Sequence, residues 1–168
     1  MPQNKILILN SQQVYQKINR ISYQIYEDNY SEDEIIIVGI ANKGYLLATK
    51  LVEQLKKISK CKITLAKLTI NKDNPIDNSG KLDISPDKLT DKVIILVDDV
   101  LNSGKALIYG VKYLLDFPIK KMSTAVLVDR NHKKYPIGTH YVGLSLSTTL
   151  QNHISLEFNK SEITAFLN

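Results

Sequence analysis

Two adjacent aspartates, Asp98 and Asp99, follow the most apolar run of the chain, residues 93–97. A polar segment that contains Gly104 comes next, over residues 102–106, and leads into an apolar pattern with helical spacing. Such a strand–loop–helix unit directs backbone N–H groups toward the helix N-terminus and forms an anion site. The two acids either cap this turn or face sugar hydroxyls and positive charge on a reacting carbon. The segment therefore predicts a site for a phosphorylated sugar.

The rest of the chain alternates between helical and strand-like apolar patterns. Helices are predicted from a cap at Ser11 to about residue 29, over residues 45–59, and from Gly104 to a point before residue 117. Strands are predicted over residues 35–39, 63–70, 93–97, 122–128, 141–144 and 154–158. Breakers such as Asn74-Pro75 and Ser85-Pro86 predict a long loop over residues 71–91.

This alternation predicts an α/β fold, with a central, mostly parallel sheet and helices on both of its faces. In such sheets ligands bind in the loops beyond the carboxyl ends of the strands. Three segments occupy that position, namely residues 39–44, 98–106 and 129–132. The ligand is therefore expected among these three loops.

The composition is that of a soluble globular protein, with 168 residues, of which 43% are hydrophobic and 23% are charged. This length predicts one domain over residues 1–168. No run approaches the ~20 apolar residues of a membrane span, and the first residues lack the pattern of a signal peptide. A single cysteine, Cys61, excludes an internal disulfide, so we expect a reducing compartment and a cytoplasmic location.

The segment Asp-Asp-Val-Leu-Asn-Ser-Gly, residues 98–104, resembles the phosphoribosyl-pyrophosphate (PRPP) signature of type I phosphoribosyltransferases. Residues 37–48 and 125–137 are similar to two loops of one branch, the bifunctional pyrimidine-operon attenuator/uracil phosphoribosyltransferases. Tyr141, Gly143 and the pair Ser147-Thr148 continue the similarity. The resemblance extends from about residue 5 to residue 158.

The resemblance implies the type I phosphoribosyltransferase fold, in which terminal segments form a small hood beside the sheet. It implies transfer of the phosphoribosyl group of PRPP to a pyrimidine base, with uracil as the leading candidate and Mg²⁺ as the cofactor. Pyrophosphate, ribose oxygens and water would hold most of the coordination sites of Mg²⁺, so no metal site built from protein ligands is expected. A homodimer is also implied.

Carried over position by position, the resemblance gives the site four parts. Asp98 and Asp99 meet the ribose hydroxyls and stabilise positive charge at the anomeric carbon, and Lys72 takes the place of the family's catalytic arginine. Asp129 and Arg130 border the base pocket. The backbone N–H groups of Asn102, Ser103, Gly104, Lys105 and Ala106 bind the 5′-phosphate, and Ala41, Asn42, Lys43 and Gly44 hold the pyrophosphate, with an unusual peptide geometry in that loop.

The chain departs from the family pattern at several of these positions. Ala106 replaces a threonine or serine that donates to the 5′-phosphate, a loss worth roughly 1.5–3 kcal/mol, or ~10- to 100-fold in PRPP affinity. Lys72 keeps the charge of the arginine but lacks its bidentate fork. Asn102 also differs, and its side chain offers an additional donor. We therefore expect a weakened transferase or a changed substrate.

RNA is the second candidate partner. Arg20, His132 and Lys133 match the RNA surface of the branch, and the net charge of 22 − 17 = +5 attracts polyanions. Tyr23 and Asp28 stand where histidine and a basic residue are usual, and an acid at that position repels phosphate. The regulatory half of the branch is therefore less well matched than the enzymatic half.

Other kinds of site are less consistent with the sequence. Residues 39–44 resemble half of a Walker loop, but Tyr45 occupies the position of the required lysine. The three histidines have no metal-ligand spacing with Cys61. Two hypotheses remain: a PRPP-dependent transferase, and an RNA attenuator or nucleotide/PRPP sensor with weak or vestigial catalysis.

Overall fold

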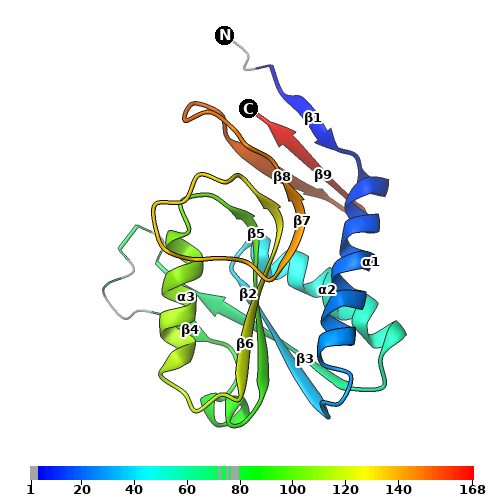
Figure 1. The fold of residues 1–168 in the computed structure, drawn as a ribbon, viewed down its shortest axis with the longest axis vertical. Helices are drawn as coiled ribbons and strands as arrows, with labels where there is room; N and C mark the ends of the chain where they lie inside the picture. The colour runs from blue at the N-terminus through cyan, green and yellow to red at the C-terminus, as the bar shows by residue number, and fades with distance from the viewer. Residues whose placement is uncertain (1–3, 72, 75, 77–79) are drawn as a thin grey trace.

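The main element of the fold is a six-stranded sheet in the order β4-β3-β2-β5-β6-β7 (Figure 1). The computed structural model describes residues 4–168 except 72, 75 and 77–79. Neighbouring strands from β3 to β7 are parallel, and only β4 pairs antiparallel, with β3. The strands are β2 (Glu34–Ile40), β3 (Lys62–Thr69), β4 (Lys81–Leu82), β5 (Val93–Leu101), β6 (Lys121–Asp129) and β7 (Tyr141–Ser145).

The central strands carry long apolar runs because both faces of the sheet are covered. Ile35 and Ile37 of β2 belong to one hydrophobic core, whereas Ile36 and Val38 belong to the other. This division follows from the alternation of side chains along a strand. Helices α1 (Ser11–Asp28) and α2 (Lys43–Ile58) contribute to the first core, and α3 (Lys105–Leu115) contributes to the second. The predicted α/β architecture, with helices on both faces, is confirmed.

Helix α1 begins at Ser11, one residue earlier than a cap at Ser11 predicts. Asn10 is the N-cap, and its side chain and that of Gln13 exchange hydrogen bonds with each other's backbone N–H groups, which forms a capping box. The helix buries one apolar stripe against the sheet. No helix in the described part of the chain has the length and apolar character needed to cross a lipid bilayer.

A second, three-stranded antiparallel sheet forms the hood, in the order β1-β9-β8. It combines the N-terminal strand β1 (Ile6–Leu9) with β8 (Ile154–Asn159) and β9 (Glu162–Leu167) from the other end of the chain. Figure 1 shows this sheet at one end of the molecule, above α1 and near the labelled end of β5. The hood implied by the resemblance is therefore present and is built from both terminal segments.

Several predicted boundaries require correction. β5 does not stop before the two aspartates but continues to Leu101, because β6 pairs with it as far as Asp129. The segment predicted as one long loop contains β4 and a short 3-10 helix, Pro86–Leu89. The strands β1 and β9 were not predicted from the periodicity. Each of the strands β1, β4 and β9 depends on pairing with residues distant in the sequence.

Candidate active site

The two aspartates lie on the last part of β5, where successive side chains alternate in direction. Asp98 is 5% exposed, and its Oδ1 accepts a hydrogen bond from the Asp99 N–H at 3.0 Å. A Cβ at Gly44 would lie 2.9 Å from the same Oδ1, so the start of α2 packs directly against this carboxylate. Asp99 is more accessible. The pair thus divides into a buried carboxylate beneath α2 and a carboxylate that faces open space.

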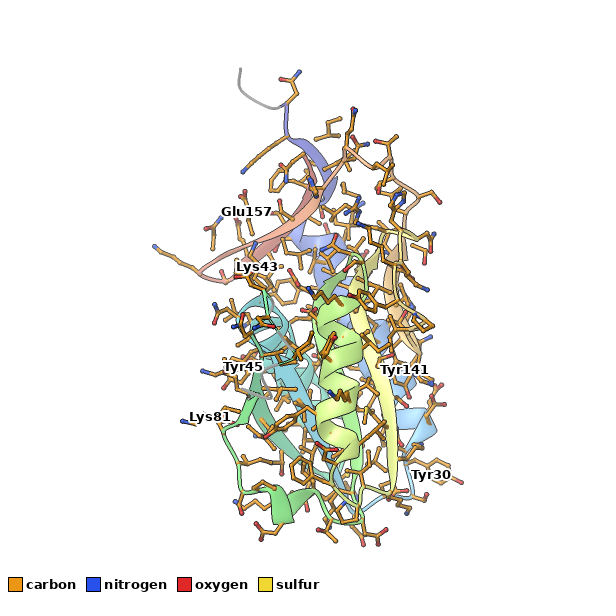
Figure 2. The ribbon with its side chains drawn as sticks, turned by 90° about the vertical axis from the view of Figure 1, so that its left-hand side faces the viewer. Tyr30, Lys43, Tyr45, Lys81, Tyr141 and Glu157 are labelled. Carbon is orange, nitrogen blue, oxygen red and sulfur yellow. The ribbon has the colours of Figure 1, made fainter. Side chains whose placement is uncertain are left out.

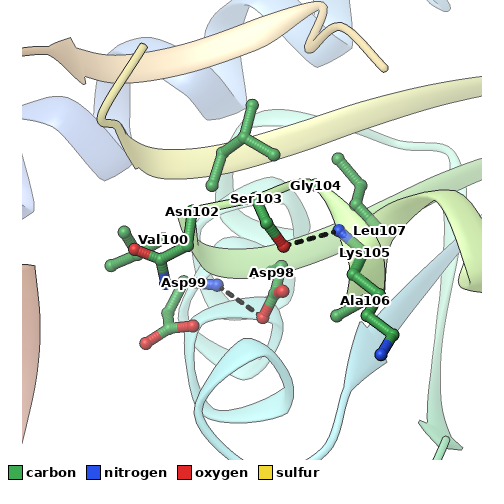
Figure 3. A pocket seen from close by; sticks show the side chains of 10 residues that line it. Asp98, Asp99, Val100, Asn102, Ser103, Gly104, Lys105, Ala106 and Leu107 are labelled. Carbon is green, nitrogen blue, oxygen red and sulfur yellow. Dashed lines mark hydrogen bonds between the residues drawn. The ribbon is translucent and has the colours of Figure 1, made fainter. Parts of the chain in front are cut away.

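The loop after β5 surrounds a cavity of about 220 Å³ (Figure 3). Gly104 has φ of 86°, and a Cβ there would lie 2.4 Å from the Ile137 side chain, so the turn requires glycine.

The first i→i−4 hydrogen bond of α3 joins the Ile108 N–H to the Gly104 carbonyl at 2.9 Å. The N–H groups of residues 105–107 therefore precede the helical ladder, and that of Lys105 donates to Ser103 Oγ at 3.2 Å. Such a turn suits an anion. The lining residues are Asp98, Asp99, Val100, Leu101, Asn102, Ser103, Gly104, Lys105, Ala106 and Leu107.

Backbone hydrogen bonds from the segment that follows β6 hold this loop in place. The Ser103 carbonyl accepts hydrogen bonds from the N–H groups of Lys134 and Tyr135, at 2.8 and 3.2 Å. The Leu101 carbonyl accepts one from the Arg130 N–H at 3.2 Å. Because these carbonyl groups are bonded to the β6–β7 connection, the loop is fixed before a ligand arrives.

A second cavity, of about 550 Å³, adjoins the first. The peptide bond between Ala41 and Asn42 in its wall is cis, an unusual geometry that the resemblance implies for this loop. Lys43 Nζ donates to the Leu156 carbonyl of the hood at 2.7 Å, so this amine is already bonded within the protein. Figure 2 shows Lys43 next to Glu157, the residue that follows Leu156 in β8. Asp99 and Asn102 line both cavities and stand at their junction. The lining residues are Ala41, Asn42, Lys43, Thr69, Ile70, Asp99 and Asn102.

The residues predicted at the base pocket lie at the end of β6 and are largely buried. Asp129 Oδ1 accepts a hydrogen bond from the Asn131 N–H at 2.8 Å, and Lys133 Nζ lies 3.7 Å from Asp129 Oδ2. Arg130 is 6% exposed and donates to three oxygens outside β6. Among the described residues that line the two cavities, neither Asp129 nor Arg130 is present. Their predicted contact with a base stays a prediction.

The three candidates for RNA binding lie on two segments of the chain, and their joint use in binding stays a prediction. Arg20 donates to the carbonyl oxygens of Val142 and Gly143 at 3.1 and 2.7 Å, which fixes its guanidinium against β7. His132 and Lys133 lie in the segment after β6. Within the part of the chain that the structure describes, no hydrogen bond or ion pair joins Arg20 to either of them.

Two features of the site were not predicted from the sequence. Thr69 and Ile70 line the second cavity, and their position at the end of β3 was a usable signal, because parallel strands end at one edge of a sheet. The hydrogen bond from Arg130 to Asn102 could not be predicted, because neither sequence segment alone indicates it. The predicted catalytic Lys72 lies outside the described residues. No three His, Cys, Asp or Glu side chains among the described residues are placed to hold a metal ion.

Comparison with known proteins places this site in a family. Residues 7–158 match the family described as "Phosphoribosyl transferase domain". A protein of Brevibacillus brevis named "Bifunctional protein PyrR" is 32% identical over 170 residues, which cover 95% of this chain and 93% of the relative. A protein of the same name from Streptococcus agalactiae is 34% identical over 145 residues, which cover 83% of this chain and 82% of the relative.

Solved structures share the fold. A hypoxanthine-guanine phosphoribosyltransferase from Bacillus anthracis matches with a TM-score of 0.73 at 18% identity, over 95% of this chain and 96% of that chain. The hypoxanthine phosphoribosyltransferase of Trypanosoma cruzi matches with a TM-score of 0.75 at 10% identity, over 95% and 94% of the two chains. The fold is therefore the type I phosphoribosyltransferase fold. Taken with the family match over residues 7–158, these findings show that the chain belongs to the phosphoribosyltransferase family and is a phosphoribosyltransferase.

Proposed function

We propose that this enzyme transfers the phosphoribosyl group of PRPP to a pyrimidine base, with uracil as the leading substrate, and forms a nucleoside monophosphate and pyrophosphate. The observation that carries the proposal is the pair of adjoining cavities that share Asp99 and Asn102. A ribose with phosphate at one end and pyrophosphate at the other matches this arrangement. The choice of a pyrimidine rests on the similarity to the relatives named bifunctional protein PyrR.

In this proposal the loop after β5 holds the 5′-phosphate through the N–H groups of residues 103–106, which positions the ribose. As the bond from the anomeric carbon to pyrophosphate breaks, positive charge develops on that carbon, as in other glycosyl transfers. The Asp99 carboxylate, fixed on β5, stabilises that charge. Asp98 supports it indirectly, because the Asp98 side chain accepts the hydrogen bond of the Asp99 N–H. Residues 41–44 receive the pyrophosphate.

The donor groups at the two cavities fit a magnesium ion that arrives with its substrate. Asp99 lines both cavities, and no cluster of three ligating side chains is present among the described residues. Mg²⁺ commonly binds through substrate phosphates and water together with one or two carboxylates, so pyrophosphate, ribose oxygens and water would hold most of its coordination sites and Asp99 would supply at most one. When bound, Mg²⁺ neutralises charge on the pyrophosphate group.

A second candidate function is regulation by binding of pyrimidine-operon RNA or of a nucleotide. The word "bifunctional" in the names of the relatives supports it. The hydrogen bonds that Arg20 and Asp28 make within the protein support RNA binding less. Arg20 is bonded to β7, and Asp28, an acid on the same helix, accepts a hydrogen bond from the Tyr141 hydroxyl at 2.7 Å. A gel-shift titration with a pyrimidine-leader hairpin tests this function, and a salt-sensitive complex would support it.

The quaternary state and the location of the enzyme belong to the same proposal. The family resemblance supports a homodimer, which sedimentation velocity tests directly. The single cysteine, Cys61, agrees with a reducing compartment such as the cytoplasm.

The decisive experiment measures pyrophosphate release from PRPP and Mg²⁺ with a panel of bases: uracil, cytosine, hypoxanthine, guanine and adenine. We expect release with uracil and little with the purines. Release with hypoxanthine or guanine alone would show that the base substrate is a purine and not a pyrimidine. No release with any base, together with a rise in melting temperature in the presence of uridine monophosphate, would support the nucleotide-sensing alternative.

A further inference from the structure

We infer that the Asn102 side chain is a ligand-binding hydrogen-bond donor for the ribose of PRPP, and that buried Arg130 is the positioning residue that orients it. The inference rests on the proposed use of PRPP and adds to it a contact that is specific to this chain. It begins from one hydrogen bond, from Arg130 Nη1 to Asn102 Oδ1 at 3.1 Å.

This bond fixes which way the Asn102 amide faces. A guanidinium has five N–H donors and no acceptor, so the atom of Asn102 that it contacts must be the carbonyl oxygen. The NH₂ group of the amide then points away from Arg130. Within the described part of the chain, no hydrogen bond engages that NH₂ group. Because Asn102 is exposed and lines both cavities, the two N–H donors are left for a ligand.

Arg130 is itself held rigidly. Its side chain is 6% exposed, and it donates from Nε to Thr148 Oγ1 at 3.1 Å and from Nη2 to the Thr149 carbonyl at 3.3 Å. A planar guanidinium bonded on three sides cannot rotate without breaking several hydrogen bonds. The segment around residues 148–149 therefore fixes Arg130, and Arg130 fixes the Asn102 amide. Because Arg130 is buried and lines neither cavity, it acts on PRPP through Asn102 and not directly.

The neighbour of Asn102 at the junction indicates what the amide binds. Asp99 lines the same two cavities, and Figure 3 shows the Asn102 and Asp99 side chains together at one end of the loop, with Ala106 toward the other. A carboxylate accepts hydrogen bonds and an amide NH₂ donates them. A sugar hydroxyl does both, so the pair matches the hydroxyl groups of a ribose. A phosphate group at this point would be repelled by Asp99.

A double-mutant cycle tests the inference. The dissociation constant of PRPP with Mg²⁺ and its KM are measured for the wild type, Asn102→Ala, Arg130→Met and the double variant. We expect each single variant to bind PRPP about tenfold more weakly, the upper range for one neutral hydrogen bond, and the KM for the base to stay unchanged in Asn102→Ala. The double variant should bind like Asn102→Ala alone, because Arg130 acts through Asn102. Arg130→Lys should restore part of the affinity, because an ammonium can donate to the same oxygen.

One control variant separates this role from a general loss of stability. Asn29→Ala removes another asparagine amide, which donates to the Ile25 carbonyl at the end of α1, and should lower the melting temperature without changing the affinity for PRPP. Additive effects of the Asn102 and Arg130 variants would overturn the positioning role. A changed KM for the base with an unchanged KM for PRPP would overturn the assignment to the ribose. If the wild type does not bind PRPP, the proposed function fails together with this inference; if it binds and all variants bind equally, only the inference fails.

Discussion

The chemistry that we assign to this enzyme depends most on one carboxylate. Asp99 lies on β5 at the junction of the two cavities, and within the described residues its carboxylate makes no hydrogen bond or ion pair. Its neighbour Asp98 is buried against the start of α2. A strand thus presents one of two identical side chains to the ligand and buries the other. The sequence alone did not distinguish these roles.

Asp99→Asn should lower kcat by about 100-fold or more, because the amide cannot stabilise positive charge on the anomeric carbon. The melting temperature should change little, since the carboxylate has no partner in the described structure. Steady-state kinetics with PRPP and the best base measure this effect. Asp116→Asn, at the exposed end of α3, is the matched control. An unchanged kcat for Asp99→Asn would remove the charge-stabilising role.

A substitution at Ala106 should raise the affinity for PRPP instead of lowering activity. It lies in the first turn of α3 and lines the cavity of the phosphate loop, where the resembled family carries a hydroxyl residue. Ala106→Thr should strengthen PRPP binding about tenfold, because one hydrogen bond to a charged phosphate is restored. Calorimetric titration measures the dissociation constant. Ala106→Val has the same shape without the hydroxyl and should give no gain; an equal gain from both variants would contradict the prediction.

At the scale of elements, the loop between β5 and α3 depends on a glycine that no other residue replaces. Gly104 combines φ of 86° with an approach of 2.4 Å between its would-be Cβ and Ile137. Gly104→Ala should cost about 2 kcal/mol or more of folding free energy and weaken PRPP binding. Denaturant unfolding measures the first effect and calorimetry the second.

The β6–β7 connection supplies a matched control for this variant. At Gly138 an added Cβ would meet no heavy atom within 4 Å. Gly138→Ala should therefore change the free energy of unfolding by less than about 0.5 kcal/mol. Equal losses for the two variants would show that the geometry of the turn at Gly104 is not what the loop requires.

Helix α1 is joined to the edge of the sheet by the hydrogen bond from the Tyr141 hydroxyl to Asp28. Burial, and next this hydrogen bond, raise the pKa of Tyr141 above its ordinary value. The stabilisation is therefore present below about pH 10, the ordinary tyrosine pKa, and is lost as the pH rises through the higher pKa of the folded state. Tyr141→Phe should cost about 1 kcal/mol at pH 7 and less at pH 11, measured by denaturant unfolding. A cost that is independent of pH would contradict this origin.

The elements that the sequence predicts correctly are those whose signal is local. The apolar runs of β2, β5 and β6 and the helical stripe of α1 carry their own periodicity. The strands β1 and β9 were missed because they are defined by pairing with each other across the whole length of the chain. The extension of β5 through two acids has the same cause, since its pairing with β6 outweighs the low strand propensity of aspartate.

In the molecule as a whole, the two cavities are lined by the loop at residues 41–43, by the end of β3 and by the segment from the end of β5 into α3, and the hood contacts the first of these through Lys43. The sequence predicts the phosphate loop and the loop at residues 41–44, because a glycine and polar residues follow apolar strands there. It does not predict how Arg130 reaches Asn102, or that Lys43 is bonded to the hood at Leu156. Such contacts depend on how distant segments pack, and no local pattern encodes them.

The central claim is that the turn after β5 binds the phosphate of a phosphorylated ribose. A crystal structure of the enzyme with uridine monophosphate tests it most directly. We expect the 5′-phosphate within hydrogen-bond distance of the N–H groups of residues 103–106, with the ribose hydroxyls beside Asp99. A nucleotide bound elsewhere, or with its phosphate away from this turn, would show that the turn is not the phosphate site.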